Sequence, residues 1–180
     1  MSNSNNSNSN NINPNNGRNI NEKDGNRRTA LHRAVSRGNL EEARRLLNRG
    51  ANVNSRVTST TGLERTALHL TASTNRANII RLLLNKGATL NARDVHGVTP
   101  LMIAASRGKK DAVAALLAAG ASLTRKDRSG HDALYYALRS SNHSIIRQLL
   151  NKGARTHNYL NNWHLQLMGA VPKRSARHGN

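Results

Sequence analysis

The sequence contains no cysteine and no phenylalanine, and its only aromatic residues are one tryptophan and three tyrosines. Without cysteine the chain has no disulfide framework, no thiolate zinc site and no cysteine nucleophile. No apolar run approaches about 18 residues, the length that a membrane-spanning helix requires. A hydrophobic core must therefore come from Leu, Ile, Val and Ala, which suits closely packed small helices.

Acidic residues are also scarce. The 180 residues include 9 Asp and Glu against 28 Lys and Arg, which gives a formal charge of +19. A chain with this balance attracts anionic partners. Most of its cations are arginine, whose planar guanidinium favours bidentate contacts with carboxylate or phosphate.

The two ends differ from the middle in composition. Residues 1–20 contain ten Asn and four Ser, and such a segment has too little apolar surface to offset the entropy lost on ordering. We therefore expect a disordered leader over 1–20. The last ten residues, 171–180, are predicted to be a basic flexible tail.

A repeat runs through the region between these ends. One landmark is a Gly-Ala pair, found at Gly50-Ala51, Gly87-Ala88, Gly120-Ala121 and Gly153-Ala154. A second begins with Thr or Asp, at Thr29, Thr66, Thr99 and Asp132. Both landmarks recur at spacings of 37, 33 and 33 residues. A fixed period in this range indicates stacked repeats.

Each repeat predicts two helices and a loop. Thr99 is a good N-cap, Pro100 suits the first helical position, and Gly108 can end the short helix in a left-handed conformation. A second helix from Lys109 to Ala118 follows, and an extended hairpin loop leads to the next repeat. The predicted fold class is an all-α solenoid of helix-turn-helix units.

These units resemble ankyrin repeats, on the evidence of Thr-Pro/Ala-Leu-His, Gly38-Asn39, the Leu-Leu pairs and Gly-Ala-x-x-Asn. Four repeats are assigned to about 21–54, 55–91, 92–124 and 125–157, and the apolar residues of 158–170 predict a C-terminal capping segment. Arg27, Asn75 and Ser141 stand where the family has glycine, so strain is expected there. The four extra residues between repeats 1 and 2 fall in 55–61, within a lengthened finger loop.

Catalytic signals are absent from the sequence. The resemblance implies that His32 and His69 hydrogen-bond neighbouring loop backbone, and the other histidines show no metal-ligand spacing. No paired carboxylates, nucleophile elbow or phosphate-binding glycine loop occurs. We expect a protein that is not an enzyme and that uses no cofactor and no metal.

The resemblance also implies that partners contact a concave side, formed by the finger tips and one face of each first helix. Repeat phase maps nine cations and no carboxylate onto this side, and none of its positions carries an aromatic residue. The predicted partner-binding residues are Arg28, Arg37, Arg56, Arg65, Arg93, Arg107, Lys126, Arg128 and Arg139.

Two functions remain open at this point. The favoured one is a protein-interaction module that captures an acidic surface or segment of another protein. The alternative is electrostatic, sequence-nonspecific nucleic-acid binding, which would lack an aromatic stacking platform and depend steeply on salt.

The expected cellular setting follows from the absence of targeting signals. The first ten residues contain no apolar stretch of the kind a signal peptide needs. We expect a monomer that does not insert into membranes and is intracellular, in the cytoplasm or the nucleus. A few ankyrin-like repeats behind a low-complexity leader also resemble viral and bacterial adaptors, which implies a host cell if the source is of that kind.

Overall fold

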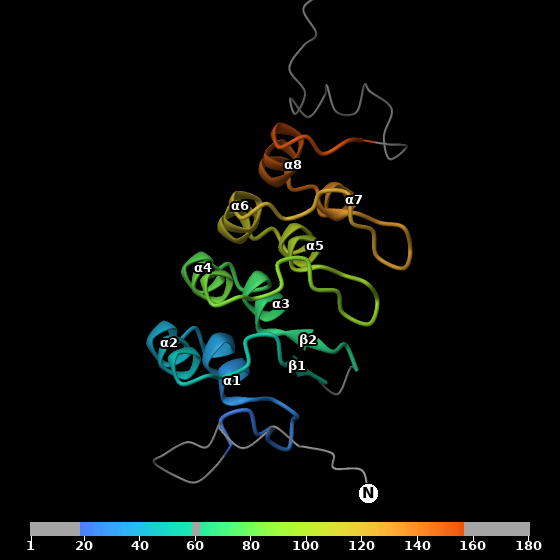
Figure 1. Cartoon of the computed structure of the whole chain (residues 1–180). Helices are drawn as coiled ribbons and strands as arrows, with labels where there is room; N and C mark the ends of the chain where they lie inside the picture. Colours follow the sequence, from blue (N-terminus) through green and yellow to red (C-terminus); the bar gives the residue numbers. More distant parts are fainter. Residues whose placement is uncertain (1–18, 59–61, 157–180) are drawn as a thin grey trace, which may run out of the picture.

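The computed structural model describes residues 19–58 and 62–156, and these fold as a stack of helix pairs (Figure 1). The first helices form one row, the second helices form another, and the loops between pairs project to one side. The pairs are α1 (Ala30–Arg37) with α2 (Leu40–Asn48), α3 (Ala67–Ala72) with α4 (Ala77–Asn85), α5 (Pro100–Ser106) with α6 (Lys110–Ala118), and α7 (Ala133–Arg139) with α8 (His143–Asn151). This arrangement confirms the predicted all-α solenoid.

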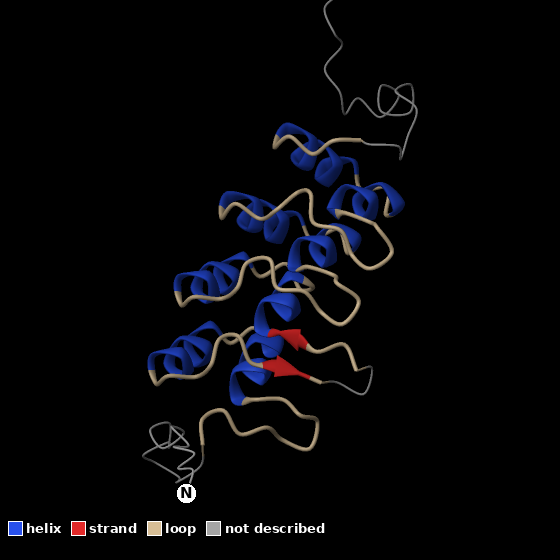
Figure 2. Ribbon diagram, turned by 45° about the vertical axis from the view of Figure 1, so that its right-hand side comes forward, coloured by secondary structure: helices blue, strands red, loops and turns tan. Residues whose placement is uncertain are grey.

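We call the projecting loops fingers and number them by the first helix that each precedes, so the first finger precedes α1 and the second lies between α2 and α3. One finger differs from the others. The finger between α2 and α3 carries a short antiparallel pair, β1 (Arg56–Val57) and β2 (Arg65–Thr66), seen in red in Figure 2. The insertion predicted at 55–61 includes β1, and its residues 59–61 lie outside the described part of the chain.

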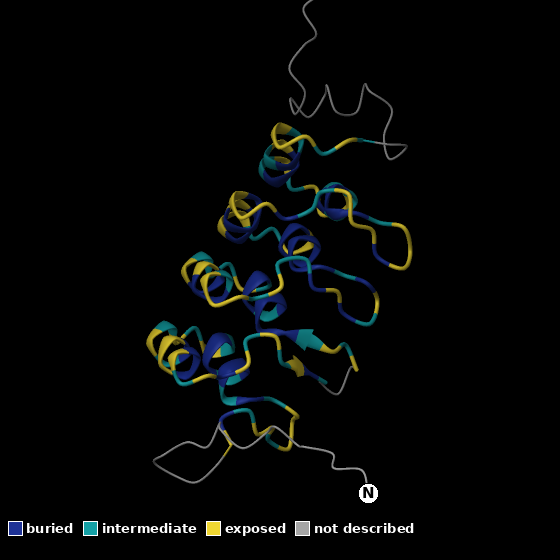
Figure 3. Cartoon of the chain, in the orientation of Figure 1, coloured by how far each residue is buried: buried dark blue, intermediate teal, exposed yellow. Residues whose placement is uncertain are grey.

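The core is aliphatic, as the composition requires. Leu31, Leu68, Leu101 and Leu134 hold the same position in successive first helices, and each is 1% exposed. The first and second helices pack on one another and on those of the next repeat, so the buried side chains form one continuous cluster (Figure 3). Stacking therefore supplies the burial that a single short helix pair could not.

The helix starts follow the predicted capping chemistry. Thr29, Thr99 and Asp132 each accept a hydrogen bond from the backbone N–H three residues later. Gly38 ends α1 with φ of 80°, a left-handed conformation that glycine adopts at no steric cost.

Strained turns occur at the predicted positions and at one more. Arg27, Asn75 and Ser141 have φ of 55°, 60° and 51°, so the sequence identified them correctly. Glu64, with φ of 48°, was missed. It stands in the second finger where Gly97 and Gly130 stand in the third and fourth, so counting back from each N-cap would have found it.

The described residues include only part of the regions where the sequence predicted domain boundaries. Ile20 is 8% exposed and belongs to the core cluster, so the packed region begins by Asn19, earlier than the boundary predicted after residue 20. The rest of the leader, the capping segment 158–170 and the tail 171–180 lie outside the described residues. No helix in the described ranges is long and apolar enough to cross a membrane.

Replacing Ser141 with glycine should raise the free energy of unfolding by about 0.5–1 kcal/mol, because glycine removes the strain of a positive φ. The matched change Asn75→Gly should instead lower it by about 1 kcal/mol. The Asn75 side chain accepts hydrogen bonds from Asp111 N and Ala112 N, at 2.9 and 3.1 Å, and so caps α6 of the next repeat. Urea unfolding measures both, and equal shifts would contradict this account.

Candidate functional site: the inner surface

The candidate site is the inner surface, by which we mean the side of the stack formed by α1, α3, α5 and α7 together with the adjoining fingers. Three of the nine predicted cations lie at the ends of first helices: Arg37 on α1, Arg107 after α5 and Arg139 on α7. The other six lie on fingers: Arg28, Arg56, Arg65, Arg93, Lys126 and Arg128. All are exposed except Arg28 and Arg65, which are half-buried.

Two of the finger arginines brace one finger against the next. Arg56 Nη1 donates to the carbonyl oxygens of Glu64 and Arg93, at 3.2 and 3.0 Å. Arg93 Nη2 donates to the carbonyl oxygen of Lys126 at 3.0 Å. Arg56, Arg93 and Lys126 each follow a Gly-Ala glycine by six residues, so the period stacks them and the guanidinium groups link the stacked loops.

Arg65 is held by a buried carboxylate. Its Nε lies 3.2 Å from Asp94 Oδ2, and the Asp94 side chain is 0% exposed. The other oxygen of Asp94 accepts hydrogen bonds from the backbone N–H groups of His96 and Val98, each at 3.0 Å. The expectation of a carboxylate-free surface therefore needs correction at two arginines, because Glu64 Oε2 also lies 3.9 Å from Arg56 Nη1.

Six of the predicted cations remain available. Within the described ranges, the side chains of Arg28, Arg37, Arg107, Lys126, Arg128 and Arg139 form no hydrogen bond and no ion pair. Their charges are solvated and can be offered to an anion without breaking an internal contact. The structure thus divides the predicted residues into three with internal partners and six without.

The inner surface also carries aromatic rings near its C-terminal end, contrary to the prediction. The rings of His131 and Tyr135 stack with centroids 3.6 Å apart and an interplanar angle of 8°. Tyr136 donates its hydroxyl to Asp127 Oδ2 at 2.6 Å, and burial together with this bond raises the pKa of Tyr136 to about 12. Repeat phase could have placed Tyr136 here, because it is the counterpart of Arg33, which faces Asp24 in repeat 1.

His32 and His69 have the structural role that the resemblance to ankyrin repeats implied. Nε2 of His32 lies 3.0 Å from the carbonyl oxygen of Ser55, and Nε2 of His69 lies 3.1 Å from that of Val98. Their Nδ1 atoms accept from the backbone N–H groups of Thr29 and Thr66. Burial lowers the pKa of each histidine to about 4, so both are neutral and tie a helix start to the following finger.

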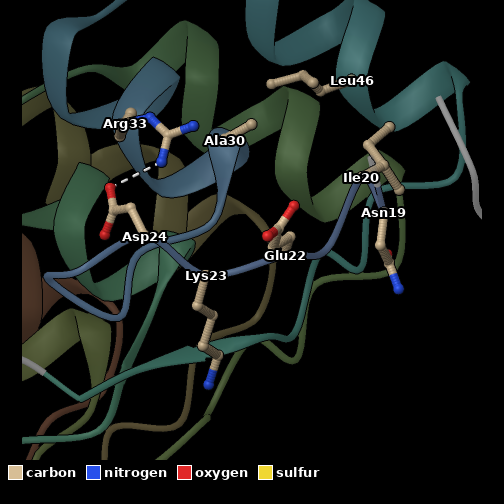
Figure 4. Close-up of a pocket in the computed structure, with 8 residues that line it drawn as sticks. All are labelled: Asn19, Ile20, Glu22, Lys23, Asp24, Ala30, Arg33 and Leu46. Atoms are coloured by element: carbon tan, nitrogen blue, oxygen red, sulfur yellow. Dashed lines mark hydrogen bonds and ion pairs between the residues drawn. The ribbon is translucent and has the colours of Figure 1, made fainter. Parts of the chain in front are cut away.

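A pocket of about 250 Å³ lies at the N-terminal end of the stack (Figure 4). Ile20 and Leu46 form part of its wall, and Arg33 Nη1 lies 2.7 Å from Asp24 Oδ2 beside them. Apolar side chains next to an internal ion pair are what one repeat presents to another, so the pocket belongs to the end of the fold. Among the described residues no group of three His, Cys, Asp or Glu could hold a metal ion.

Comparison with known proteins agrees with this architecture. A family model described as ankyrin repeats (3 copies) matches residues 3–94 and 92–159. No curated protein matches the chain. Ankyrin repeats are generally non-enzymatic and serve as protein-protein interaction modules. The helix pairs, the caps and the period all agree with this family model, which spans most of the chain. The chain therefore belongs to the ankyrin repeat family.

Proposed function

We propose that this protein is a monomeric, non-enzymatic interaction module whose inner surface binds an acidic surface or segment of another protein. The observation that carries the proposal is the set of exposed, internally unpaired arginines at the ends of the first helices: Arg37, Arg107 and Arg139. A guanidinium group matches the geometry of a carboxylate and can hold it through two parallel hydrogen bonds.

The positions of these arginines support binding rather than solubility alone. They follow one edge of the inner surface across three of the four repeats, so a segment lying along the stack would meet them in succession. The outer helices are basic as well, and there Arg44 and Arg45 are paired with Glu41 and Glu42, whereas the exposed Arg81 and Arg147 form no ion pair within the described residues. Arginine is also enriched among the residues that dominate protein-protein binding energies.

Nucleic-acid binding is the second candidate, favoured by the formal charge of +19 and by the stacked rings of His131 and Tyr135. Stacking on an aromatic ring is how proteins without sequence preference hold single strands. This pair lies at one end of the stack, whereas such channels carry rings for successive bases. The protein-binding proposal therefore comes first.

The test compares two triple charge reversals in the full chain. Arg37, Arg107 and Arg139 are changed to Glu in one variant, and the exposed outer-helix residues Arg81, Lys110 and Arg147 in the other. Both sets lower the formal charge by six. The probes are a fluorescein-labelled peptide of about 20 glutamates and a random single-stranded DNA of about 20 nucleotides, measured by anisotropy over a range of salt concentrations.

The inner-surface variant should lose at least about tenfold in affinity for the peptide, and the outer variant less than about threefold, because only the first set meets the carboxylates directly. Circular dichroism should show equal helicity in both. Equal losses would mean that net charge alone drives binding. DNA that stays bound at about 0.3 M salt while the peptide dissociates would favour the second candidate.

A further inference from the structure

The acidic residues are distributed unevenly along the stack. In the part of repeats 1 and 2 that the structure describes, the inner and outer surfaces carry local ion pairs: Asp24 with Arg33, Glu41 with Arg44, Glu42 with Arg45 and Glu64 with Arg56. On α3 no charged side chain faces outward, since Leu70, Ser73 and Thr74 stand where other first helices carry arginine. On the inner surface of this half, Arg33, Arg56 and Arg65 thus have a carboxylate neighbour, whereas Arg28 and Arg37 have none among the described residues.

Repeats 3 and 4 are different, because their carboxylates are buried or face away. Asp94, Asp127 and Asp132 are 5%, 8% and 8% exposed. Asp94 holds Arg65, Asp127 accepts from Tyr136, and Asp132 caps α7. The remaining carboxylate of 92–156, Asp111, lies on the second helix α6. None of the four offers an exposed negative charge on the inner surface.

The unpaired cations gather at this same end. Arg107 follows α5, Arg139 ends α7, and the fourth finger adds Lys126 and Arg128. Helices α5 and α7 lie next to each other in Figures 1 and 2. On this part of the inner surface, as far as the structure describes it, exposed positive charge meets no exposed carboxylate, which favours the binding of an anion there.

A hollow of about 300 Å³ lies beside one of these cations and is lined by Ser106, Tyr136, Arg139 and Ser140. Ser106 donates its hydroxyl to the carbonyl oxygen of Ile103, and Ser140 donates to those of Ala105 and Ala137. Tyr136 donates to Asp127. Among the residues that line the hollow, Arg139 is therefore the one whose hydrogen-bond donors are available to a ligand. The half-buried Tyr136 ring supplies an apolar wall.

We propose that the acidic partner is anchored at repeats 3 and 4 by glutamate side chains, one of which sets its carboxylate against Arg139 and its methylene groups against Tyr136. Packed helices lie about 8–10 Å apart. In a polyproline II segment, which rises about 3.1 Å per residue and has about three residues per turn, side chains three residues apart lie on the same face. Two glutamates three residues apart in such a segment therefore suit Arg107 and Arg139 on the adjacent helices. This inference rests on the proposed function and adds the location of the binding site on the stack and the spacing of the glutamates that it recognises.

The repeat provides a matched control. Arg37 and Arg107 both lie eight residues after the N-cap of their first helix, both are exposed and neither has an internal partner. The single variants Arg37→Glu and Arg107→Glu thus make the same change at the same position of repeats 1 and 3. The probe is a fluorescein-labelled 12-residue peptide of Ser and Gly with two glutamates three residues apart, measured by anisotropy on the full chain.

Arg107→Glu should weaken binding of this peptide at least about tenfold and Arg37→Glu less than about threefold. Arg139→Lys keeps the charge but loses the planar guanidinium, and should weaken it about threefold. Equal losses at Arg37 and Arg107 would overturn the anchoring at repeats 3 and 4 and leave the proposed function standing. A wild-type chain that binds neither this peptide nor polyglutamate would overturn both.

Discussion

Acidification should unfold repeats 1 and 2 before repeats 3 and 4. His32 and His69 are buried and neutral, with a pKa of about 4 in the folded chain against 6.5 in the unfolded one. Between these values the unfolded state binds more protons than the folded state, so stability falls as the pH falls from about 6.5 to 4. The loss is about 3 kcal/mol per histidine by pH 4.

The two later repeats lack this liability because other residues fill the same position. Met102 occupies it in repeat 3, where its sulfur lies 3.4 Å from the backbone nitrogen of Thr99, and Tyr135 occupies it in repeat 4. Because each repeat of a solenoid contacts only its neighbours, loss of one end need not unfold the other. Both of these buried histidines thus lie in the N-terminal half.

Hydrogen exchange followed by mass spectrometry at pH 7 and pH 4.5 measures this order. Amides of α1 to α4 should lose protection at pH 4.5 while those of α5 and α6 keep it. In the His69→Met variant, which copies the side chain of repeat 3, the free energy of unfolding should depend less on pH. His96→Gln, an exposed control on the third finger, should behave like the wild type. If α5 and α6 opened first, or if stability were equal at pH 6.5 and 4.5, the role assigned to these histidines would be wrong.

The period made the backbone and the capping residues predictable. Each landmark that recurs with it has one local role, since Thr99 caps a helix, Gly38 ends one, and Arg27, Asn75 and Ser141 occupy turns whose φ is positive. These are interactions within a few residues, so one repeat suffices to identify them. The nine site positions were likewise placed on fingers and first-helix ends by phase.

The position of a residue within the repeat could not predict which groups of a neighbouring repeat a long side chain contacts. Arg76 is the N-cap residue of the second helix α4, yet its Nη1 donates to the carbonyl oxygens of Val35 and Ser36, at 2.8 and 2.7 Å, and so caps the end of α1. Arg93 and Arg65 are committed in the same way to Lys126 and Asp94. An arginine can extend along several directions from one backbone position, so its partner depends on packing that a linear pattern does not encode.

Charge reversal of an arginine tests partner binding cleanly only where the side chain has no internal partner. Reversing Arg65 would place a carboxylate beside the buried Asp94, and reversing Arg93 would remove the contact between the third and fourth fingers. Either change would alter the fold as well as the charge. Arg37, Arg107 and Arg139 avoid this difficulty, because in the described part of the chain their side chains have no internal partner.

Replacing Asp94 with alanine should be the most damaging single change on the inner surface, lowering the free energy of unfolding by about 3 kcal/mol. The variant leaves the half-buried Arg65 guanidinium without its carboxylate and the N–H groups of His96 and Val98 without their acceptor. Removing one member of a buried ion pair is costly because the remaining charge stays desolvated.

Asp24→Ala is the matched control, because Asp24 holds the same position in the first finger. It also accepts from two backbone N–H groups, those of Asn26 and Arg28, and pairs with one arginine, Arg33. The side chain of Asp24 is 32% exposed, whereas that of Asp94 is 0% exposed. Water can replace the lost carboxylate at the first finger but not at the third. Urea unfolding should therefore show a much smaller loss for Asp24→Ala, and equal losses would mean that burial is not what makes the contact between Arg65 and Asp94 important.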